Sequence, residues 1–286
     1  MIVFLNGEFV AEEKAVVSVF DRGFLYGDGL FEGMIVTRGR PFRWNEHIER
    51  LRSGVAFLKL TLPYSPAQLL EFALQLIERN QMPDCILRLS LSRGITERGY
   101  SPKNATRPAL VMTLHPAPRI GGARPPRWRV ITSSFRLPAG DPLTRFKTAN
   151  KLPQVLARAE ADAAGAQEAL LLNTAGCLAE GTTSNVFWVR DNVVCTPPPP
   201  SGALPGVTRQ AILDLCVKNK IPWREKQARP AVLRGADGVF LTMTSMGVVE
   251  VEFLDGRRLK RSPLVKKLWA DYRGLTGQGR GKKAEG

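Results

Sequence analysis

The stretch RFKTANKL, residues 145–152, decides how this chain folds and what chemistry it can perform. It contains Lys147 and leads into an alanine-rich segment, residues 152–164, that predicts a helix with Pro153 in its first turn. A lysine amine can form a covalent bond with the carbonyl group of a cofactor. The chain has many lysines, so Lys147 gains meaning only from the motifs on either side of it.

Two motifs downstream offer what a phosphate-bearing cofactor with a pyridine ring needs. In EGTTSN, residues 180–185, Glu180 stands where a strand runs into a turn, and its carboxylate can keep a pyridine nitrogen protonated. In LPGVTR, residues 204–209, Gly206 allows a close backbone approach. Thr208 is predicted as the N-cap of a helix over residues 208–218, where a phosphate can bind. Lysine, carboxylate and phosphate cradle together are the set that pyridoxal chemistry requires.

Length and composition favour a two-domain enzyme without a metal centre. The 286 residues are 44% hydrophobic, which is ample for two cores. No run approaches the roughly 20 apolar residues of a membrane span, and the N-terminus lacks a signal pattern, so we expect a soluble, cytoplasmic protein. Four cysteines lie far apart and only two histidines exist. We therefore expect no metal site, and we expect the cysteines to be reduced core residues.

The net charge of +15 raises the question of a polyanionic partner. The charge is scattered, however, and concentrates only in residues 257–283. We therefore expect a solubilising surface and do not expect a nucleic-acid site. A non-catalytic polyanion-binding protein stays open as an alternative of a different class.

The chain up to residue 115 mixes strand-like and helical patterns, which predict an N-terminal α+β domain. Strands are predicted at residues 15–20, 33–37, 85–92 and 110–114, and helices at 48–58 and 69–77. Residues 116–127 are rich in proline and glycine and predict an interdomain linker.

Residues 128–273 predict a C-terminal α/β domain that carries Lys147. Its strands are predicted at 129–132, in a hairpin of 169–172 with 186–189, and at 239–242 and 248–251. Residues 274–286, rich in glycine and lysine, predict a disordered basic tail.

Two further motifs upstream complete an ordered set of five, namely FLYGDGLFEG at 24–33 and EHIERL at 46–51. In this order the motifs resemble those of the class IV aminotransferases, the fold type IV pyridoxal phosphate enzymes. The resemblance covers nearly the whole chain. It implies an α+β, two-domain fold like that of D-amino acid aminotransferase, with pyridoxal 5'-phosphate at the domain interface. It also implies a small amino substrate and a homodimer in which loops of one subunit border the other's site.

Carried over by matching position, the resemblance implies a role for each motif. Lys147 is implied as the Schiff-base lysine and proton shuttle, Glu180 as the partner of the pyridine nitrogen, and Arg50 as the phosphate cation. Lys151 is a rival for Lys147, but the family pattern favours Lys147. Further phosphate contacts are implied at Val207, Thr208 and Thr244. Substrate contacts are implied at Phe31, Arg98, Tyr100 and Ser245.

The segment SRGITERGYS, residues 92–101, resembles 4-amino-4-deoxychorismate lyase most. We therefore favour that lyase, which eliminates pyruvate and forms 4-aminobenzoate for folate synthesis. The alternative is an aminotransferase for branched-chain L-amino acids or D-amino acids with 2-oxoglutarate. Phe31-Glu-Gly33 is closer to the branched-chain pattern, whereas EGTTSN and Met34, where those enzymes tend to have an arginine, depart from it.

Overall fold

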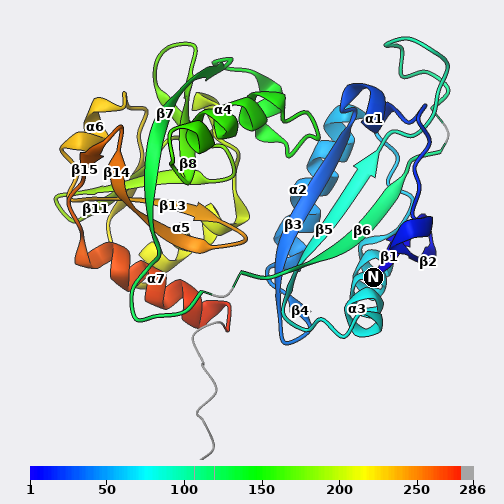
Figure 1. Ribbon diagram of the computed structural model, residues 1–286, viewed down its shortest axis with the longest axis horizontal. Coiled ribbons are helices and arrows are strands. Elements are labelled where there is room, and N and C mark those ends of the chain that lie inside the picture. Colours follow the sequence, from blue (N-terminus) through cyan, green and yellow to red (C-terminus); the bar gives the residue numbers. More distant parts are fainter. Residues whose placement is uncertain (106, 119, 278–286) are drawn as a thin grey trace, which may run out of the picture. The chain divides into compact units, whose positions relative to one another are not determined.

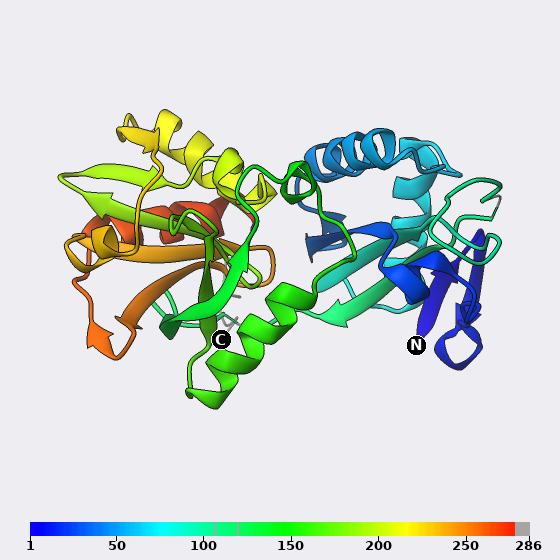
Figure 2. The same ribbon diagram turned by 90° about the horizontal axis from the view of Figure 1, so that it is seen from above.

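The computed structural model describes residues 1–105, 107–118 and 120–277, and the chain divides into two compact units. Unit 1 comprises Met1–Pro118 together with Phe146–Lys151, and unit 2 comprises Arg119–Arg145 and Leu152–Gly286. Among the described residues, no helix is long and apolar enough to cross a membrane. Both units combine a sheet with helices, as the predicted α+β class requires (Figures 1 and 2).

Unit 1 is built on a six-stranded sheet in the order β2-β1-β6-β5-β3-β4. Its elements are β1 (Ile2–Leu5), β2 (Glu8–Ala11), η1 (Glu12–Lys14), α1 (Arg22–Tyr26), β3 (Gly29–Thr37), β4 (Arg40–Pro41), α2 (Trp44–Leu58), α3 (Pro66–Arg79), β5 (Cys85–Ser92) and β6 (Leu110–Pro116). All its pairings are antiparallel, and α2 and α3 cover one face of the sheet (Figure 2). The apolar side chains that recur at helical spacing, such as Leu51, Leu69 and Leu76, form the core with alternate residues of the strands.

Unit 2 is built on a nine-stranded mixed sheet in which β7 pairs in parallel with both β8 and β14. Its strands are β7 (Arg127–Leu137), β8 (Glu168–Asn173), β9 (Leu178–Gly181), β10 (Asn185–Arg190), β11 (Val193–Thr196), β12 (Trp223–Glu225), β13 (Gly238–Met243), β14 (Gly247–Leu254) and β15 (Arg257–Arg258). Its helices are η2 (Pro142–Arg145), α4 (Leu152–Ala163), η3 (Pro199–Ser201), α5 (Val207–Lys218), α6 (Ala231–Arg234) and α7 (Pro263–Leu275). Helix α4 packs on β7 and β8, whereas α5 and α7 pack on β13 and β14 (Figure 1).

One predicted strand and one predicted strand pairing are wrong. Residues 15–20 form no strand, because this run of β-branched residues has no partner strand and stays largely exposed. The predicted hairpin of residues 169–172 with 186–189 does not form either. Instead β8 pairs with the short strand β9, and β10 pairs with β11 and β13.

The segment Phe146–Lys151 differs from its predicted place, because it belongs to unit 1 although the residues on both sides belong to unit 2. Thr148 forms an antiparallel bridge with Leu30 of β3. The predicted tail also begins too early. Helix α7 continues to Leu275, since Tyr272 and Thr276 are buried, and residues 278–286 lie outside the described part of the chain.

Candidate active site

Lys147 is held against β3 of unit 1 by backbone hydrogen bonds of its own segment. The amide of Phe31 donates to the Lys147 carbonyl at 2.9 Å, and the amide of Ala149 donates to the Gly29 carbonyl at 2.8 Å. The neighbouring Phe146 stacks on Phe57 of α2 with ring centroids 4.5 Å apart. The backbone of residues 147–149 therefore pairs with β3 as a short strand would, and this pairing fixes the position of Lys147 beside β3.

The ring of Phe31 forms an apolar surface next to two cationic groups. The Lys147 ammonium lies 4.6 Å from its centroid, and the Arg88 guanidinium of β5 lies 4.1 Å from it. Burial lowers the pKa of Arg88 from its ordinary value. A carboxylate near this ring could pair with Arg88, a residue that the sequence analysis missed because nothing in its local sequence distinguishes it from any other arginine of a strand.

Behind Phe31, the buried carboxylate of Glu32 joins two residues of α2. Arg50 donates to it through two atoms, Nε to Oε1 at 2.8 Å and a terminal nitrogen to Oε2 at 2.6 Å. His47 Nδ1 lies 2.7 Å from Oε2. Burial acts to raise the pKa of Glu32, but Arg50 and His47 outweigh it and hold that pKa at about 2.

Burial also lowers the pKa of His47, despite the adjacent carboxylate. We therefore assign a neutral imidazole that donates its Nδ1–H to the ionised Glu32. The positive charge of Arg50 is thus oriented by a fixed anion. The predicted phosphate cation lies beside β3 with its guanidinium plane already set.

In unit 2, one backbone residue connects Glu180 of β9 with the loop that enters α5. The amide of Leu204 donates to Glu180 Oε2 at 2.8 Å, and the carbonyl of Leu204 accepts from Asn185 Nδ2, also at 2.8 Å. Gly206 lies against the same Asn185 side chain so closely that a Cβ atom would strike its Oδ1. The predicted pyridine partner and the predicted phosphate loop therefore have a fixed relative position.

Helix α5 begins at Val207, so the N-cap is Gly206 and the predicted N-cap role of Thr208 is wrong. No side chain caps this helix start, because glycine has none to offer. Val207 and Thr208 are both buried in the first turn. Their amides belong to the set that a helix leaves without internal partners, which suits a phosphate dianion.

A second glutamate of unit 2, Glu168, holds the turn that follows Glu180, and the sequence analysis missed it. Its carboxylate is completely buried and accepts from the amides and hydroxyls of Thr182 and Thr183 and from the hydroxyl of Ser184. The carboxylate of Glu168 therefore accepts hydrogen bonds from all three hydroxyl side chains of EGTTSN. Only the fold brings the first residue of β8 under the turn, so no local pattern could have revealed it.

Thr244 and Ser245 lie in the tight turn between β13 and β14, both partly buried. Asn185 pairs with Thr242 in the ladder of β10 and β13, which brings this turn to the same end of the sheet as the EGTTSN turn. The Thr183 hydroxyl reaches Met243 Sδ at 3.9 Å. Unit 2 therefore gathers the predicted residues Glu180, Val207, Thr208, Thr244 and Ser245 from neighbouring turns.

Arg98 and Tyr100 lie on the loop between β5 and β6 of unit 1, and both side chains are exposed. Tyr100 packs on Tyr26 with ring centroids 5.4 Å apart. In the described residues no group of three or more His, Cys, Asp or Glu side chains is placed to hold a metal ion. Three of the four cysteines are buried, and burial raises the pKa of the Cys85 thiol to about 11 and of Cys216 to about 12.

The donor groups fit pyridoxal 5'-phosphate. Unit 2 offers a buried helix start without a side-chain cap, backed by a glycine that leaves no room for a Cβ atom, and a carboxylate oriented by a backbone amide. Unit 1 offers a lysine beside Phe31 and a guanidinium oriented by Glu32, the next residue of the same strand.

Comparison with known proteins agrees with this interpretation. The family model of the class IV aminotransferases matches residues 29–252. A putative branched-chain-amino-acid aminotransferase of Methanocaldococcus jannaschii is 34% identical over 96% of this chain and 96% of its own. The D-alanine aminotransferase of Staphylococcus aureus is 32% identical over 93% of this chain and 94% of its own.

Solved structures of the same kind superpose over almost the whole chain. Branched-chain amino acid aminotransferase of Escherichia coli matches with a TM-score of 0.91 at 28% identity, covering 99% of this chain and 97% of that one. The T.th. branched-chain enzyme with pyridoxamine 5'-phosphate matches at 0.90 and 30%, covering 98% and 95%. A putative 4-amino-4-deoxychorismate lyase of Legionella pneumophila matches at 0.84 and 28%, covering 94% and 98%.

These matches confirm the predicted fold type IV architecture, the family resemblance and the cofactor. They also replace the alternative of a non-catalytic polyanion-binding protein. The chain therefore belongs to the class IV aminotransferases and is a pyridoxal 5'-phosphate-dependent enzyme.

Proposed function

We propose that the enzyme is an aminotransferase that takes the amino group of branched-chain L-amino acids and passes it to 2-oxoglutarate. The observation that carries this proposal is the apolar ring of Phe31, which has the Lys147 ammonium and the Arg88 guanidinium close to it. An apolar side chain can lie on the ring while a carboxylate pairs with Arg88. The similarity to branched-chain aminotransferases over nearly the whole chain supports the same substrate class.

Each predicted cofactor residue has a task in this reaction. Pyridoxal phosphate, when bound, withdraws electrons and so acidifies the α-carbon of the substrate. Lys147 would take the α-proton of the substrate with its amine and give it back later in the reaction. Glu180 would keep the pyridine nitrogen protonated, and the amide of Leu204 orients the Glu180 carboxylate for that task. The phosphate would be held by Arg50, by the amides of Val207 and Thr208, and by the hydroxyls of Thr208 and Thr244.

A second candidate is 4-amino-4-deoxychorismate lyase, which the sequence segment 92–101 favours. That segment places Arg98 and Tyr100 on an exposed loop, where a guanidinium and a phenol could contact a carboxylated ring. The match to a putative lyase of Legionella pneumophila supports this candidate. Both candidates share the proton abstraction at Lys147 and differ in what leaves the substrate. In either one, Arg98 and Tyr100 are the proposed contacts of a substrate carboxylate, which in the aminotransferase is the second carboxylate of 2-oxoglutarate, the one that does not pair with Arg88.

One experiment separates the two candidates. The purified holoenzyme is offered aminodeoxychorismate alone and, in parallel, L-leucine, L-valine, L-isoleucine or D-alanine, each with 2-oxoglutarate. Branched-chain keto acids together with glutamate support the aminotransferase. Formation of pyruvate and 4-aminobenzoate from aminodeoxychorismate, without transamination of any amino acid, contradicts it and supports the lyase.

We also propose that the enzyme is a homodimer formed through the segment that precedes and includes α1. Large apolar side chains are exposed there, among them Val16 at 75%, Phe20 at 67% and Phe24 at 75%. A row of exposed apolar residues on one short segment is typical of a protein interface. The occupant we expect is a second copy of this chain.

A further inference from the structure

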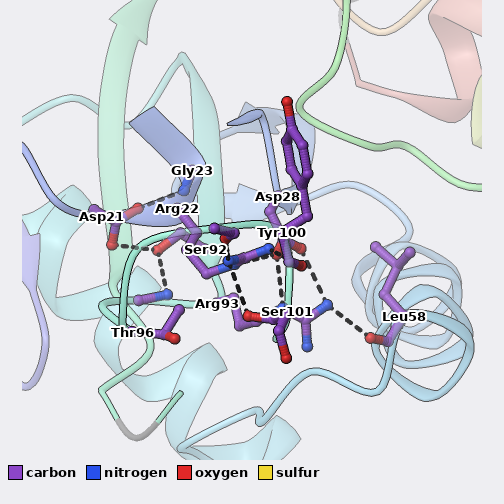
Figure 3. Close-up of polar contacts among 12 residues, drawn as sticks. Asp21, Arg22, Gly23, Asp28, Leu58, Ser92, Arg93, Thr96, Tyr100 and Ser101 are labelled. Carbon is purple, nitrogen blue, oxygen red and sulfur yellow. Dashed lines mark hydrogen bonds and ion pairs between the residues drawn. The ribbon is translucent and has the colours of Figure 1, made fainter. Parts of the chain in front are cut away.

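Arg22, the first residue of α1, is a buried arginine that donates hydrogen bonds to the backbone of a loop far away in the sequence. Only 5% of its surface is exposed. Its terminal nitrogens donate to three consecutive carbonyls, those of Gly99 at 2.9 Å, Tyr100 at 3.0 Å and Ser101 at 3.2 Å (Figure 3). These residues are the centre of the tip loop, which we define as residues 96–105 between β5 and β6. An arginine therefore fixes the path of a loop that has no regular hydrogen-bond ladder of its own.

Asp28 orients Arg22 and shares its carboxylate with a second arginine. Arg22 Nε donates to Asp28 Oδ2 at 2.8 Å, and Arg93 donates to both carboxylate oxygens at 2.7 and 3.0 Å. Arg93 also donates to the carbonyls of Leu58 and Lys59 at the end of α2 (Figure 3). Burial opposes ionisation of Asp28, but the two arginines outweigh it and lower its pKa. The cluster thus keeps a net positive charge, which carbonyl dipoles from the tip loop and α2 offset.

The base of the loop is closed without the Arg22 side chain, although the Arg22 backbone amide donates to the Gly94 carbonyl there at 2.9 Å. Asp21 and Arg107 both form bridges with Ile95, and the Ser92 hydroxyl donates to Asp21 at 2.7 Å. Gly94 has a φ of +88°, and a Cβ atom there would collide with the Arg107 carbonyl. The side-chain contacts of Arg22 are therefore not needed to close the loop base. They set the position of the tip alone.

The three carbonyls point toward Arg22. Tyr100 is 85% exposed and extends from the cluster in Figure 3. Its ring packs on Tyr26, whose ring in turn lies 5.0 Å from the Arg22 guanidinium. Gly99 adopts a φ of +118°, a backbone conformation that side chains disfavour. Arg98 and Tyr100 flank this glycine, so their directions depend on the backbone that Arg22 holds.

We propose that Arg22 is a positioning residue for substrate recognition. It fixes the tip loop so that Arg98 and Tyr100 meet the carboxylate of the substrate in a preset geometry. This inference rests on the proposed function, in which those two side chains contact the substrate. A preset loop needs no ordering when substrate binds, so the effect of Arg22 falls on KM and not on the chemical step.

The test compares Arg22→Lys with the wild-type holoenzyme. Lysine keeps the charge but, as a single ammonium, cannot hold three carbonyls and Asp28 in one plane. The substrate pair is L-leucine with 2-oxoglutarate, or aminodeoxychorismate if only the lyase reaction is observed. We expect the KM for 2-oxoglutarate, or for aminodeoxychorismate, to rise about tenfold, as for the loss of one charged hydrogen bond. The value of kcat should stay within about twofold of the wild type. Hydrogen exchange of the tip-loop amides should become faster.

Gly99→Ala perturbs the same loop from the other side. No atom lies within 4 Å of the added Cβ, so only the backbone at φ +118° is affected. It should raise KM as Arg22→Lys does, because the strained backbone shifts the Gly99 carbonyl that accepts from Arg22, while all side chains of the buried cluster stay in place. Arg52→Lys is the matched control, because Arg52 forms an exposed pair with Glu49 at 3.5 Å on α2 and should change neither KM nor exchange.

Arg98→Ala separates the inference from the proposed function. If Arg98→Ala raises KM and Arg22→Lys does not, the positioning role of Arg22 is wrong while the substrate contact stands. If Arg98→Ala and Tyr100→Phe both leave KM unchanged, the substrate contacts are wrong and the inference is overturned with them. Unchanged exchange in the tip loop of Arg22→Lys overturns it in either case. Support requires that Arg98→Ala costs less in the Arg22→Lys background than in the wild type.

Discussion

Lys147 and Lys151 belong to the same short segment, and Lys147 is the one that we propose as the reacting amine. Its carbonyl is fixed by the amide of Phe31, and its ammonium lies over the Phe31 ring. It is also close enough to lower the pKa of His47 through its charge.

We predict that Lys147→Ala removes the covalent link to the cofactor. Borohydride reduction of the holoenzyme followed by mass spectrometry should add the mass of the reduced cofactor to the wild type. It should add none to Lys147→Ala. Lys151→Ala is the matched control and should be labelled like the wild type. Labelling of Lys147→Ala at Lys151 would reverse the assignment.

Glu32 gives the enzyme a specific sensitivity to acid. Its pKa in the folded protein is about 2, below the ordinary 4.5, so the ionised carboxylate stabilises the fold. This stabilisation is present above pH 4.5 and is lost as the pH falls toward 2, at most about 3 kcal/mol. In urea unfolding between pH 5 and 3, wild type should lose stability more steeply than Glu32→Gln. Parallel loss in both proteins would contradict the prediction.

Glu168 is predicted to support the cofactor through the turn that it holds. In Glu168→Gln one acceptor oxygen becomes an NH2 group that faces hydroxyls and amides. We expect cofactor affinity to fall about tenfold, equivalent to one buried hydrogen bond. The rate at which the protein loses its cofactor absorbance during dialysis measures this change in affinity. Glu160→Gln is the control, because Glu160 also accepts from serines, Ser133 and Ser134, but on β7, and should retain the cofactor.

At the scale of elements, helix α5 begins without a side-chain cap, and the loop that leads into it is held by hydrogen bonds of Leu204 to Glu180 and Asn185. Gly206→Ala would push its Cβ atom into Asn185, whose amide also holds Leu204. We predict at least about tenfold weaker cofactor binding, because the loop must shift away from both partners. Gly274→Ala in α7 is the control. No atom lies near its added Cβ, so it should gain about 1 kcal/mol of stability and bind cofactor normally.

Elements whose pattern is complete within the local sequence can be predicted well. The strand predicted at residues 85–92 coincides with β5, because β5 alternates buried and less buried residues along its length. Helices α2 and α3 follow from apolar residues at helical spacing, although both begin earlier than predicted. The candidate cofactor residues could be named because five motifs occur in the family order.

Elements that depend on distant partners were missed. Residues 15–20 have the composition of a strand, but no other strand of the described chain lies alongside them, and composition cannot show that. Strand β9 is only four residues long and exists because β8 pairs with it. The contacts of Arg22 and Glu168 were invisible for the same reason. Their partners lie on loops that only the folded chain brings near.

The whole molecule is predicted to be a dimer that depends on its exposed apolar segment. Phe24→Asp places a charge at a position that is 75% exposed in one chain, so it should not unfold the monomer. We expect sedimentation equilibrium to show a dimer for the wild type and a monomer for Phe24→Asp. Phe57→Asp is not a suitable control, since Phe57 stacks on Phe146. Val217→Asp, exposed at 64% on α5, is suitable and should stay dimeric.

The chain passes between the units three times, at Pro118, at Phe146 and at Lys151, and this limits how its gene can be rearranged. If the chain were cut in the linker, the N-terminal fragment would contain β3 but not Thr148, its bridge partner. The C-terminal fragment would contain Lys147 but not the strand that holds it. The two halves are therefore not interchangeable modules. Lys147 is encoded in the C-terminal part of the gene, but the strand that it packs against is encoded in the N-terminal part. A recombined or permuted gene must therefore keep both parts together to retain the placed amine.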